Sequence, residues 1–589
     1  MAEKRKHYLI EGIFKRNFAV MLLAMMTGMI CVVVDSVLTG QFLGKDAVAA
    51  MGLITPATSV LMGIMSLFST GIGQLCTRSM GKADLKQVNR IFSTLVCCTA
   101  ALSAVTSAIL LALAPGIARM LGTAAEPEVT TMAGDYLKGY ALNLIPLGIA
   151  INLNALMILD NDQRRSILYA VTVFLADVVL DLVNVLFLHL GMLGMALATS
   201  FSSIIGLVIL LMHFRKKGHL LRFSTRNLDF SCLGEAIIIG MGHTVNQLSA
   251  TFRSFFLNNI LLMISGSTAL AALSVANSAF LLLVSVFSSI LSVTGSVMNL
   301  SYGEEDQNAL KRALGASIQT AYRIGTVFAV LFLAFAAPIS RVFLRGSEIE
   351  ALDQAVRFVR CYAIQNLLVL LSYSLGGSFM GTRRVKLNYL LSVLRDGVYP
   401  VACVAAMGFL FGLRGVETGI VISGVLTLAT CFLIPWLYNR KFPTSVEDFL
   451  ILPENFCAEP ERLFEASMHT VEEVADVSRQ VRQFCHERGE DDKTAMFVSL
   501  FVEEMAGNAV MHGFQGKKNR QVELRVIMGK DKRLIRLRDN GIRFDPIKWL
   551  EMNEPKSVEE NLGVRMVIGL AKDVNYIPAM GLNQMIVRL

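Results

Sequence analysis

The chain has 589 residues, of which 54% are hydrophobic and 17% charged, against about 45–50% and about 25% in an ordinary soluble domain. This composition excludes a disordered chain and argues against a single soluble enzyme. Residues 443–589 hold 20 of the 54 Lys and Arg residues but 24 of the 46 Asp and Glu residues. An apolar, basic block followed by a charged block predicts a membrane domain joined to an aqueous domain.

Twelve apolar runs of about 20 residues, the length that spans a hydrocarbon layer, fill the first 440 residues. They begin near residues 17, 51, 91, 132, 166, 191, 233, 268, 314, 357, 387 and 415. Alternate loops are basic, and by the positive-inside bias both termini are then cytoplasmic. We expect a multi-pass protein of the cell membrane whose tail faces the cytoplasm.

The membrane part repeats itself at an offset of about 222 residues. Ser79-Met-Gly81 matches Ser301-Tyr-Gly303, and further on Gly191-Met-Leu-Gly194 matches Gly412-Leu-Arg-Gly415. Six is an even number of helices, so the two halves share one orientation and a pseudo-twofold axis along the membrane normal. The repeat predicts two six-helix lobes, residues 1–228 and 229–442, with a substrate path between them.

The first half places Asp35 in its first predicted membrane helix and Asp177 and Asp181 in its fifth, whereas the matching positions of the second half hold Leu257, Asp396 and Pro400. A charge costs roughly 2.5–3.5 kcal/mol there, which makes each acid a functional candidate. Asp177 and Asp181 share one helix face, and paired carboxylates in a low dielectric can hold a proton or bind sodium. Alternatively these acids pair with Arg253 or Arg395 and only fix helix packing, or Asp35 caps its helix near the membrane surface.

Substrate residues are less clearly marked. Asn246, Gln247, Arg253 and Asn277 lie in or near the seventh and eighth helices and are candidates for a cavity. The 29 methionines suit a poorly discriminating apolar pocket and suit a lipid-facing surface equally well. An acidic ion site predicts an organic cation as the transported compound. The ten cysteines show no Cys-x-x-Cys spacing, so we interpret them as ordinary apolar side chains.

After a polar linker, residues 443–456, the segment 457–589 alternates predicted helices and strands. Strands are expected at Cys457–Ser467, Gln521–Met528, Lys532–Leu537 and Gln584–Leu589, and helices at His469–Arg488, Asp491–His512 and Leu562–Val574. The two central strands are joined by a short Gly-containing turn, which is a hairpin signal. This order predicts an α+β sandwich with the helices on one face of the sheet.

Three motifs on this frame point to a nucleotide site. Glu504 and Asn508 share a helix face, so the carboxylate can position water while the amide oxygen binds Mg²⁺. Asp539 follows a strand and can accept a hydrogen bond from the adenine amino group, and Gly541 allows close backbone approach. Gly563, at a helix start, presents backbone N–H groups to phosphate. The candidate ATP residues are Asn508, Asp539, Gly541, Phe544 and Gly563, with Glu504 as the catalytic candidate.

Residues 15–440 resemble the multidrug and toxic compound extrusion (MATE) family. The resemblance is carried by Val34-Asp35-Ser36, Gly81-Lys-Ala-Asp84, Asp177-Val-Val-Leu-Asp181 and Gly191-Met-Leu-Gly194. It implies cation-driven antiport by rocking of two lobes, with the acids of the first lobe binding H⁺ or Na⁺. Asp35 and Asp181 match acids of the family, while Asp177 stands where the family commonly has Asn.

The tail resembles the GHKL (Bergerat) ATP-binding fold, and most closely the anti-sigma-factor serine kinases. The resemblance implies that Glu504 is the general base, Asn508 the Mg²⁺ ligand and Asp539 the adenine-binding residue. Arg543 replaces the second glycine of the usual Asp-x-Gly-x-Gly motif, and Asn561 replaces a usual glycine in the last motif. Both changes fall on backbone that approaches phosphates, so we expect ATP binding and leave ATPase or protein kinase activity open.

These observations favour a bacterial, cation-coupled exporter of small amphipathic or cationic organic compounds, with an ATP-binding regulatory tail. The first alternative is a membrane-tethered signalling protein, in which the membrane domain senses a ligand and the tail binds or phosphorylates a cytoplasmic regulatory protein of the anti-anti-sigma type. The second alternative is a lipid-precursor flippase. Contact with membrane lipid is expected in every case. Nucleic acid is not an expected partner, because cytoplasmic loops account for the basic excess.

Overall fold

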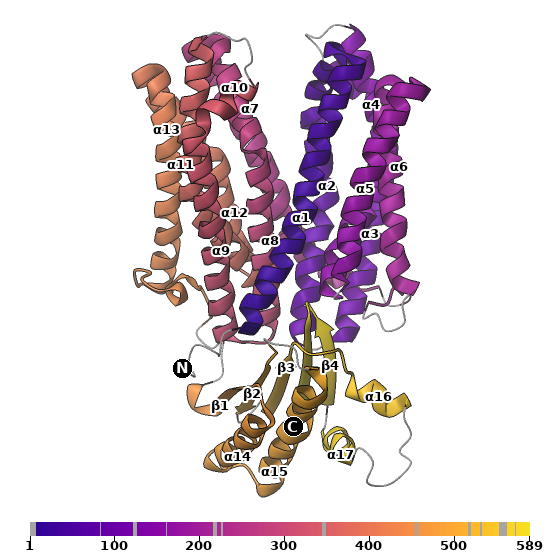
Figure 1. Cartoon of the computed structure of the whole chain (residues 1–589), viewed down its shortest axis with the longest axis vertical. Helices are drawn as coiled ribbons and strands as arrows, with labels where there is room; N and C mark the ends of the chain where they lie inside the picture. The colour runs from indigo at the N-terminus through magenta and orange to yellow at the C-terminus, as the bar shows by residue number, and fades with distance from the viewer. Residues whose placement is uncertain are drawn as a thin grey trace.

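The computed structural model describes residues 8–82, 84–121, 127–160, 162–215, 221–224, 226, 228–343, 349–453, 456, 459–515, 520–529, 533–552, 562–571 and 573–589. Two helical lobes stand side by side above a small α/β tail domain (Figure 1). The lobes approach each other next to the tail domain and diverge away from it (Figure 1). We call these two ends of the lobes the tail side and the far side.

The first lobe consists of long helices joined by short connections. They are α1 (Tyr8–Leu38), α2 (Lys45–Gly81), α3 (Leu85–Leu121), α4 (Pro127–Leu159), α5 (Gln163–Val183) and α6 (Gly191–Leu211). The second lobe contains α7 (Leu233–Ala279), α8 (Leu281–Gly303), α9 (Gln307–Ala334), α10 (Ala336–Phe343), α11 (Ile349–Gly381), α12 (Val385–Val393) and α13 (Tyr399–Asn439).

Eleven segments of the described chain are long and apolar enough to cross a membrane. The last, Val385–Asn439, is 55 residues long, which is too long for one crossing at about 1.5 Å per residue. It leaves helical geometry at Gly412, where φ is 62° and ψ is −143°. Counted as two crossings, this segment brings the total to the twelve predicted, and the all-helical two-lobe fold class is confirmed.

The largest difference from the predicted helix starts concerns the eighth helix. An eighth helix was expected to begin near residue 268, but α7 continues to Ala279 and α8 begins only at Leu281. Residues 268–279 contain neither Gly nor Pro, so the local sequence has no residue that readily breaks a helix before Phe280.

The 222-residue repeat recurs in the structure. The helices α2 and α8 end at Gly81 and Gly303, which are 222 positions apart. Gly191 and Gly412, aligned from the sequence, both have a positive φ, of 60° and 62°. Glycine alone adopts such angles without steric cost, so the same backbone turn is built into each half of the chain.

The tail domain is a five-stranded antiparallel sheet covered by helices on one face. Its strands are β1 (Leu463–Met468), β2 (Val522–Met528), β3 (Arg533–Asp539), β4 (Asp573–Ala579) and β5 (Leu582–Arg588), in the order β1-β2-β3-β5-β4. Its helices are α14 (Val471–Glu487), α15 (Asp492–Phe501), α16 (Pro546–Met552) and α17 (Leu562–Leu570). Two π-helical turns, Val502–Ala506 and Ala509–Gly513, extend α15. The predicted α+β sandwich is confirmed.

The end of the tail differs from the prediction. The last helix stops at Leu570 instead of Val574, and β4, which was not predicted, follows it. Met580 and Gly581 form the turn between β4 and β5 with φ of 55° and 88°. Pro578 lies within β4, which is at the edge of the sheet, where proline is tolerated. Cys457, the expected start of the first strand, lies outside the described residues, and α16 was not predicted either.

Replacement of Gly412 by alanine is expected to destabilise the protein by about 1–3 kcal/mol, because its φ and ψ lie in a region that only glycine adopts freely. An added Cβ would meet no atom within 4 Å, so the substitution tests backbone strain alone. The measurement is the apparent Tm of the purified protein. Gly12→Ala is the control, since Gly12 has the same open space but helical backbone. Equal Tm values for both variants would contradict the prediction.

Candidate ion site and nucleotide site

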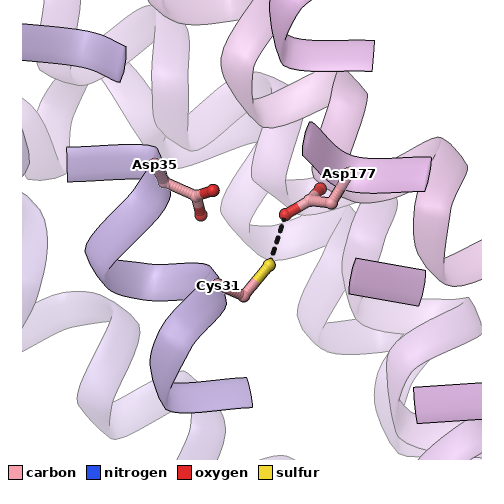
Figure 2. A group of neighbouring side chains, drawn as sticks. All are labelled: Cys31, Asp35 and Asp177. Carbon is pink, nitrogen blue, oxygen red and sulfur yellow. Dashed lines mark hydrogen bonds between the residues drawn. The ribbon is translucent and has the colours of Figure 1, made fainter. Parts of the chain in front are cut away.

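The first lobe brings acidic residues of two helices together. Asp35 of α1 lies beside Asp177 of α5, and Cys31, one helical turn before Asp35, joins them (Figure 2). One ligand atom from each of these three side chains lies within 4.8 Å of the others. Cys31 Sγ donates to Asp177 Oδ2 at 2.9 Å, and Ser202 Oγ of α6 donates to Asp177 Oδ1 at 3.0 Å.

Asp181 belongs to the same group but has different surroundings. Its side chain is 1% exposed, and its charge interacts with those of Asp35 and Asp177. Apart from the neighbouring carboxyl group of Asp35, no donor in the described chain reaches either carboxylate oxygen of Asp181. A buried carboxylate without donors is costly unless it takes up a proton or a cation. The cluster therefore combines Asp177, which accepts hydrogen bonds from Cys31 and Ser202, with Asp181, which accepts none from such donors.

The alternative pairing of these acids with Arg395 is wrong. Arg395 lies in the second lobe, where its Nε donates to both oxygens of Asp396 at 3.0 Å and its Nη2 donates to Asn246 Oδ1 at 3.0 Å. Its guanidinium also lies 3.7 Å from the centre of the Tyr373 ring. The buried arginine of the second lobe is therefore neutralised locally and does not pair with the acids of the first lobe.

The cavity candidates of the second lobe that the structure describes have different surroundings. Asn246 contacts Arg395, whereas Asn277 is exposed and lies 31 residues further along the chain. Arg253 is half-buried and lies near Tyr362 and Tyr373. The side chain of Gln247 lies outside the described part of the chain.

A cavity of about 470 Å³ opens in the tail domain, between the helices and the sheet. Its lining includes the predicted residues Asn508, Asp539 and Phe544, together with His512, Arg543, Trp549, Tyr576 and Asn583. The volume is within the range of small-molecule sites. Asn561, the second departure from the GHKL pattern, lies outside the described residues.

Asp539 is held in place by a chain of hydrogen bonds. Its Oδ1 accepts from the Gly541 N–H at 2.7 Å and from Asn583 Nδ2 at 2.8 Å, and Tyr576 donates to Asn583 Oδ1 at 2.9 Å. Burial raises the pKa of Asp539 above its usual range, although the bonds from Asn583 and Gly541 act in the opposite direction. Tyr576 and Asn583 were missed from the sequence, because the β4–β5 hairpin that carries them was not recognised.

Two glycines of the motifs are required by close contacts. A Cβ on Gly541 would lie 2.8 Å from Asp539 Oδ1 and 3.0 Å from the carbonyl oxygen of Gly513. A Cβ on Gly563 would lie about 2 Å from the Glu504 carboxylate, at 1.9 Å from its carbon. Glu504 therefore packs against the start of α17, beside the cavity rather than in its lining.

Comparison with known proteins agrees with both parts of the chain. The MatE family model matches residues 21–183 and 244–398, and the model for a histidine kinase-like ATPase domain matches residues 468–589. The multidrug export protein MepA of Staphylococcus aureus strain MRSA252 is 22% identical over 437 residues, covering 73% of this chain and 95% of its own. MepA of Staphylococcus haemolyticus is 24% identical over 231 residues, covering 38% of this chain and 51% of its own.

Solved structures share the fold. A MATE structure in complex with MaL6 has a TM-score of 0.68 at 20% identity, and an outward-facing MATE transporter has 0.67 at 20% identity. A transporter from Pyrococcus furiosus, described as having a binding pocket of reversed polarity, has 0.66 at 18% identity. Each comparison covers 72% of this chain and 95% of the other. Because the first model matches more than half of the residues, this chain belongs to the MatE family of membrane transporters and carries a histidine kinase-like ATPase domain at its C-terminal end.

Proposed function

We propose that this protein exports small cationic or amphipathic organic compounds in exchange for H⁺ or Na⁺, and that its cytoplasmic tail binds ATP with Mg²⁺ and regulates export. The observation that carries the transport part is the group formed by Asp35, Asp177 and Asp181 inside the first lobe. The names of the MepA relatives, multidrug export proteins, support the same substrate class.

The arrangement of the lobes supports alternating access. On the tail side, α2 of the first lobe and α7 of the second are in close contact. A Cβ added to Gly71 would lie 2.7 Å from the carbonyl oxygen of Ala236. Arg78 of α2 also pairs there with Glu235 of α7 at 2.6 Å. On the far side the lobes diverge (Figure 1). With the basic loops placing the tail side in the cytoplasm, this is the conformation closed to the cytoplasm.

Ion coupling follows from the unequal surroundings of the acids. Asp177 receives hydrogen bonds from Cys31 and Ser202, which stabilise its ionised form. Asp181 has no such donor within the described chain, so it is the site at which a proton or Na⁺ lowers the energy most. Neutralising the group in this way weakens its attraction for a cationic substrate, and the two cations therefore exchange.

Asp181→Asn is expected to reduce cation-driven transport at least tenfold, because the amide cannot exchange a proton or a net charge. The measurement is uptake of ethidium into proteoliposomes driven by a proton or a sodium gradient. Asp135→Asn is the matched control, since Asp135 is 41% exposed and pairs only with the neighbouring Lys138 among the ion pairs of the described chain. Gradient-driven uptake that survives in Asp181→Asn would exclude this group as the coupling site.

The tail supports nucleotide binding more directly than turnover. Asn508, the proposed Mg²⁺ ligand, and Asp539, the proposed adenine-binding residue, line the same cavity, so one bound nucleotide can contact both. The proposed base, Glu504, is instead covered by Gly563 and the start of α17. Activation of water by Glu504 requires α17 to move away. We therefore assign the tail a regulatory role in binding ATP.

Asn508→Ala and Asp539→Asn are each expected to weaken MgATP binding at least tenfold, because each removes a charged or metal-bound contact worth about 1.4 kcal/mol or more. Calorimetry on the full-length protein in detergent measures this. Gln483→Ala on α14 is the control, since Gln483 is exposed and its amide bonds only Glu487 in the described chain. Tight binding by both cavity variants would contradict the assignment of the site.

Acidification is expected to weaken ATP binding through Asp539. The raised pKa means that this carboxyl takes up a proton at a higher pH than an ordinary aspartate, and the protonated form is a poorer acceptor for the adenine amino group. The measurement is ATP affinity against pH for the wild type and for Asp539→Asn. Because protonation of ATP affects both proteins equally, the difference between their pH profiles reports on Asp539 alone. Parallel pH profiles would refute a role for Asp539 ionisation.

A further inference from the structure

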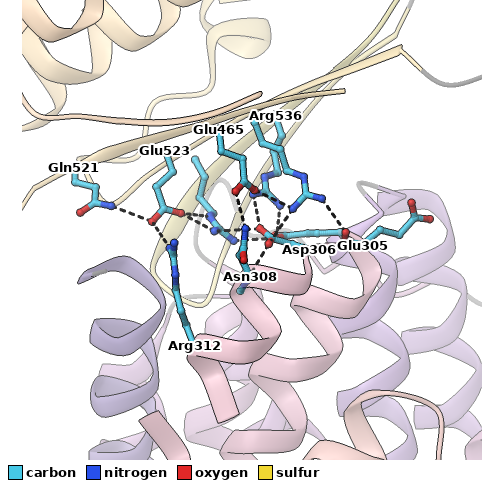
Figure 3. Close-up of polar contacts among 12 residues, drawn as sticks. Glu305, Asp306, Asn308, Arg312, Glu465, Gln521, Glu523 and Arg536 are labelled. Atoms are coloured by element: carbon cyan, nitrogen blue, oxygen red, sulfur yellow. Dashed lines mark hydrogen bonds and ion pairs between the residues drawn. The ribbon is translucent and has the colours of Figure 1, made fainter. Parts of the chain in front are cut away.

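The tail domain is joined to the second lobe by a buried network of opposite charges (Figure 3). Arg525, Arg536 and Arg538 project from the face of the sheet opposite to its helices, and each is at most 3% exposed. Arg536 pairs with Glu304 and Asp306 at 2.7 Å, and Arg538 pairs with Glu304 at 2.9 Å. These acids lie between α8 and α9, at the tail side of the second lobe.

Asp306, at the centre of the network, stays ionised at the pH of a cell. Burial by itself raises the pKa of Asp306, but the charges of Arg536, Arg525 and Arg538 outweigh it and hold that pKa well below its usual range. Asp306 also caps α9 by accepting from the Ala309 N–H at 2.9 Å. The acids are therefore fixed to the helix as well as to the sheet, and the joint to the second lobe is stiff.

The tail also contacts the first lobe, through the β4–β5 hairpin. The Met580 N–H donates to the Leu159 carbonyl oxygen at 3.2 Å, and Arg588 donates to the Lys82 carbonyl oxygen at 3.2 Å. Four side chains of the hairpin pack into the apolar core of the membrane part rather than into that of the tail: Ile577, Met580, Leu582 and Ile586. Hydrogen bonds to backbone carbonyl oxygens and apolar packing hold the tail to the first lobe, whereas ion pairs hold it to the second lobe.

The two contacts fall on equivalent points of the repeat. Lys82 follows α2 and Glu304 follows α8, and they are 222 positions apart. The tail thus spans the pseudo-twofold axis and touches the same connection in each lobe. The aspartate is common to both connections, but the two positions before it are Lys82-Ala in the first lobe and Glu304-Glu in the second, so the lobe that receives the arginines is the more acidic there.

One sheet cannot follow both lobes when they separate. If the tail side opens during transport, Lys82 and Glu304 move apart and one of the two contacts breaks. Removing buried ion pairs leaves uncompensated charges and is the more costly of the two. The hairpin therefore leaves the first lobe, and the tail remains on the second.

The same strands connect this contact to the cavity, because side chains alternate across a sheet. On β3, Arg536 and Arg538 face the membrane part, whereas Leu537 and Asp539 line the cavity. On β5, Leu582 and Ile586 pack into the core of the membrane part, whereas Asn583 and Met585 line the cavity. A nucleotide in the cavity therefore contacts the element that holds the first lobe.

We propose that the β4–β5 hairpin is a latch that keeps the tail side of the two lobes closed, and that nucleotide in the adjacent cavity changes how readily it releases the first lobe. The latch itself rests only on the alternating access proposed above, and its nucleotide control rests also on ATP binding by the tail.

A reporter of tail-side opening is available between the lobes. Gln74 of α2 is 6% exposed and its Oε1 accepts from Asn299 Nδ2 of α8 at 3.2 Å. In full-length Gln74→Cys protein in nanodiscs, maleimide labelling of this position, resolved by mass spectrometry, measures opening. Cys485, buried in the core of the tail, reports in the same sample whether the tail unfolds.

Arg536→Gln and Arg588→Ala, each added to the reporter, are expected to raise labelling at position 74 at least threefold while Cys485 stays protected. Arg533→Gln is the matched control, because Arg533 lies on the same strand but pairs with Glu490 inside the tail. Labelling that is unchanged in both variants, with Cys485 protected, overturns the latch. If a variant exposes Cys485, the same comparison is made with Ile586→Ala, and unchanged labelling there overturns the latch equally.

MgATP at saturation is expected to change labelling at position 74 at least twofold, and Asn508→Ala is expected to remove the change. If calorimetry shows that MgATP binds but labelling at position 74 does not change, nucleotide control is overturned. The latch itself is then tested by the arginine variants alone. Absence of binding overturns the ATP assignment of the tail together with nucleotide control. The failure of the latch and the failure of the ATP site are thus separated.

Discussion

The structure depends on how it compensates charges that are out of contact with water. At the tail side, Glu304 and Asp306 meet Arg525, Arg536 and Arg538, so five ionised groups are buried in one layer. Each would be costly alone, and together they fix the sheet of the tail against the second lobe. The position of the cavity, the hairpin and the contact with the first lobe all follow from this placement.

The acids of the first lobe show the opposite case. Asp177 has two donors, while apart from the carboxyl group of Asp35 no donor in the described chain reaches Asp181. In the second lobe Arg395 is neutralised by Asp396 and also donates a hydrogen bond to Asn246. A group whose charge is already matched holds structure, and one whose charge is unmatched is available to a mobile ion. The same electrostatic rule thus separates the structural charges from the proposed transport site.

The two strands β3 and β5 link the parts of the molecule. Their alternate side chains serve different neighbours, the membrane lobes on one face and the nucleotide cavity on the other. Because successive side chains of a strand point to opposite faces, a shift of the strand moves the side chains on both faces together. Ligand binding in the cavity and docking on the lobes therefore act on the same two strands. This gives the tail a physical route to the transport cycle without any ATP-driven motor.

Hydropathy and spacing in the sequence were sufficient to predict the membrane helices and the shared face of Asp177 and Asp181, because these patterns depend on neighbours within a few turns. The repeat could be predicted as well, since the same motifs recur at a constant offset. Tertiary structure alone decided that Cys31 joins the acids, that Arg395 does not, and that Tyr576 and Asn583 orient Asp539. It also decided the fate of Arg536 and Arg538. Arginines at alternate positions of a strand are typical of a face exposed to solvent. The acids that pair with them here lie more than 200 residues earlier in the chain. Local sequence patterns contain no information about a partner at that separation, since only the packing of the domains brings the two together.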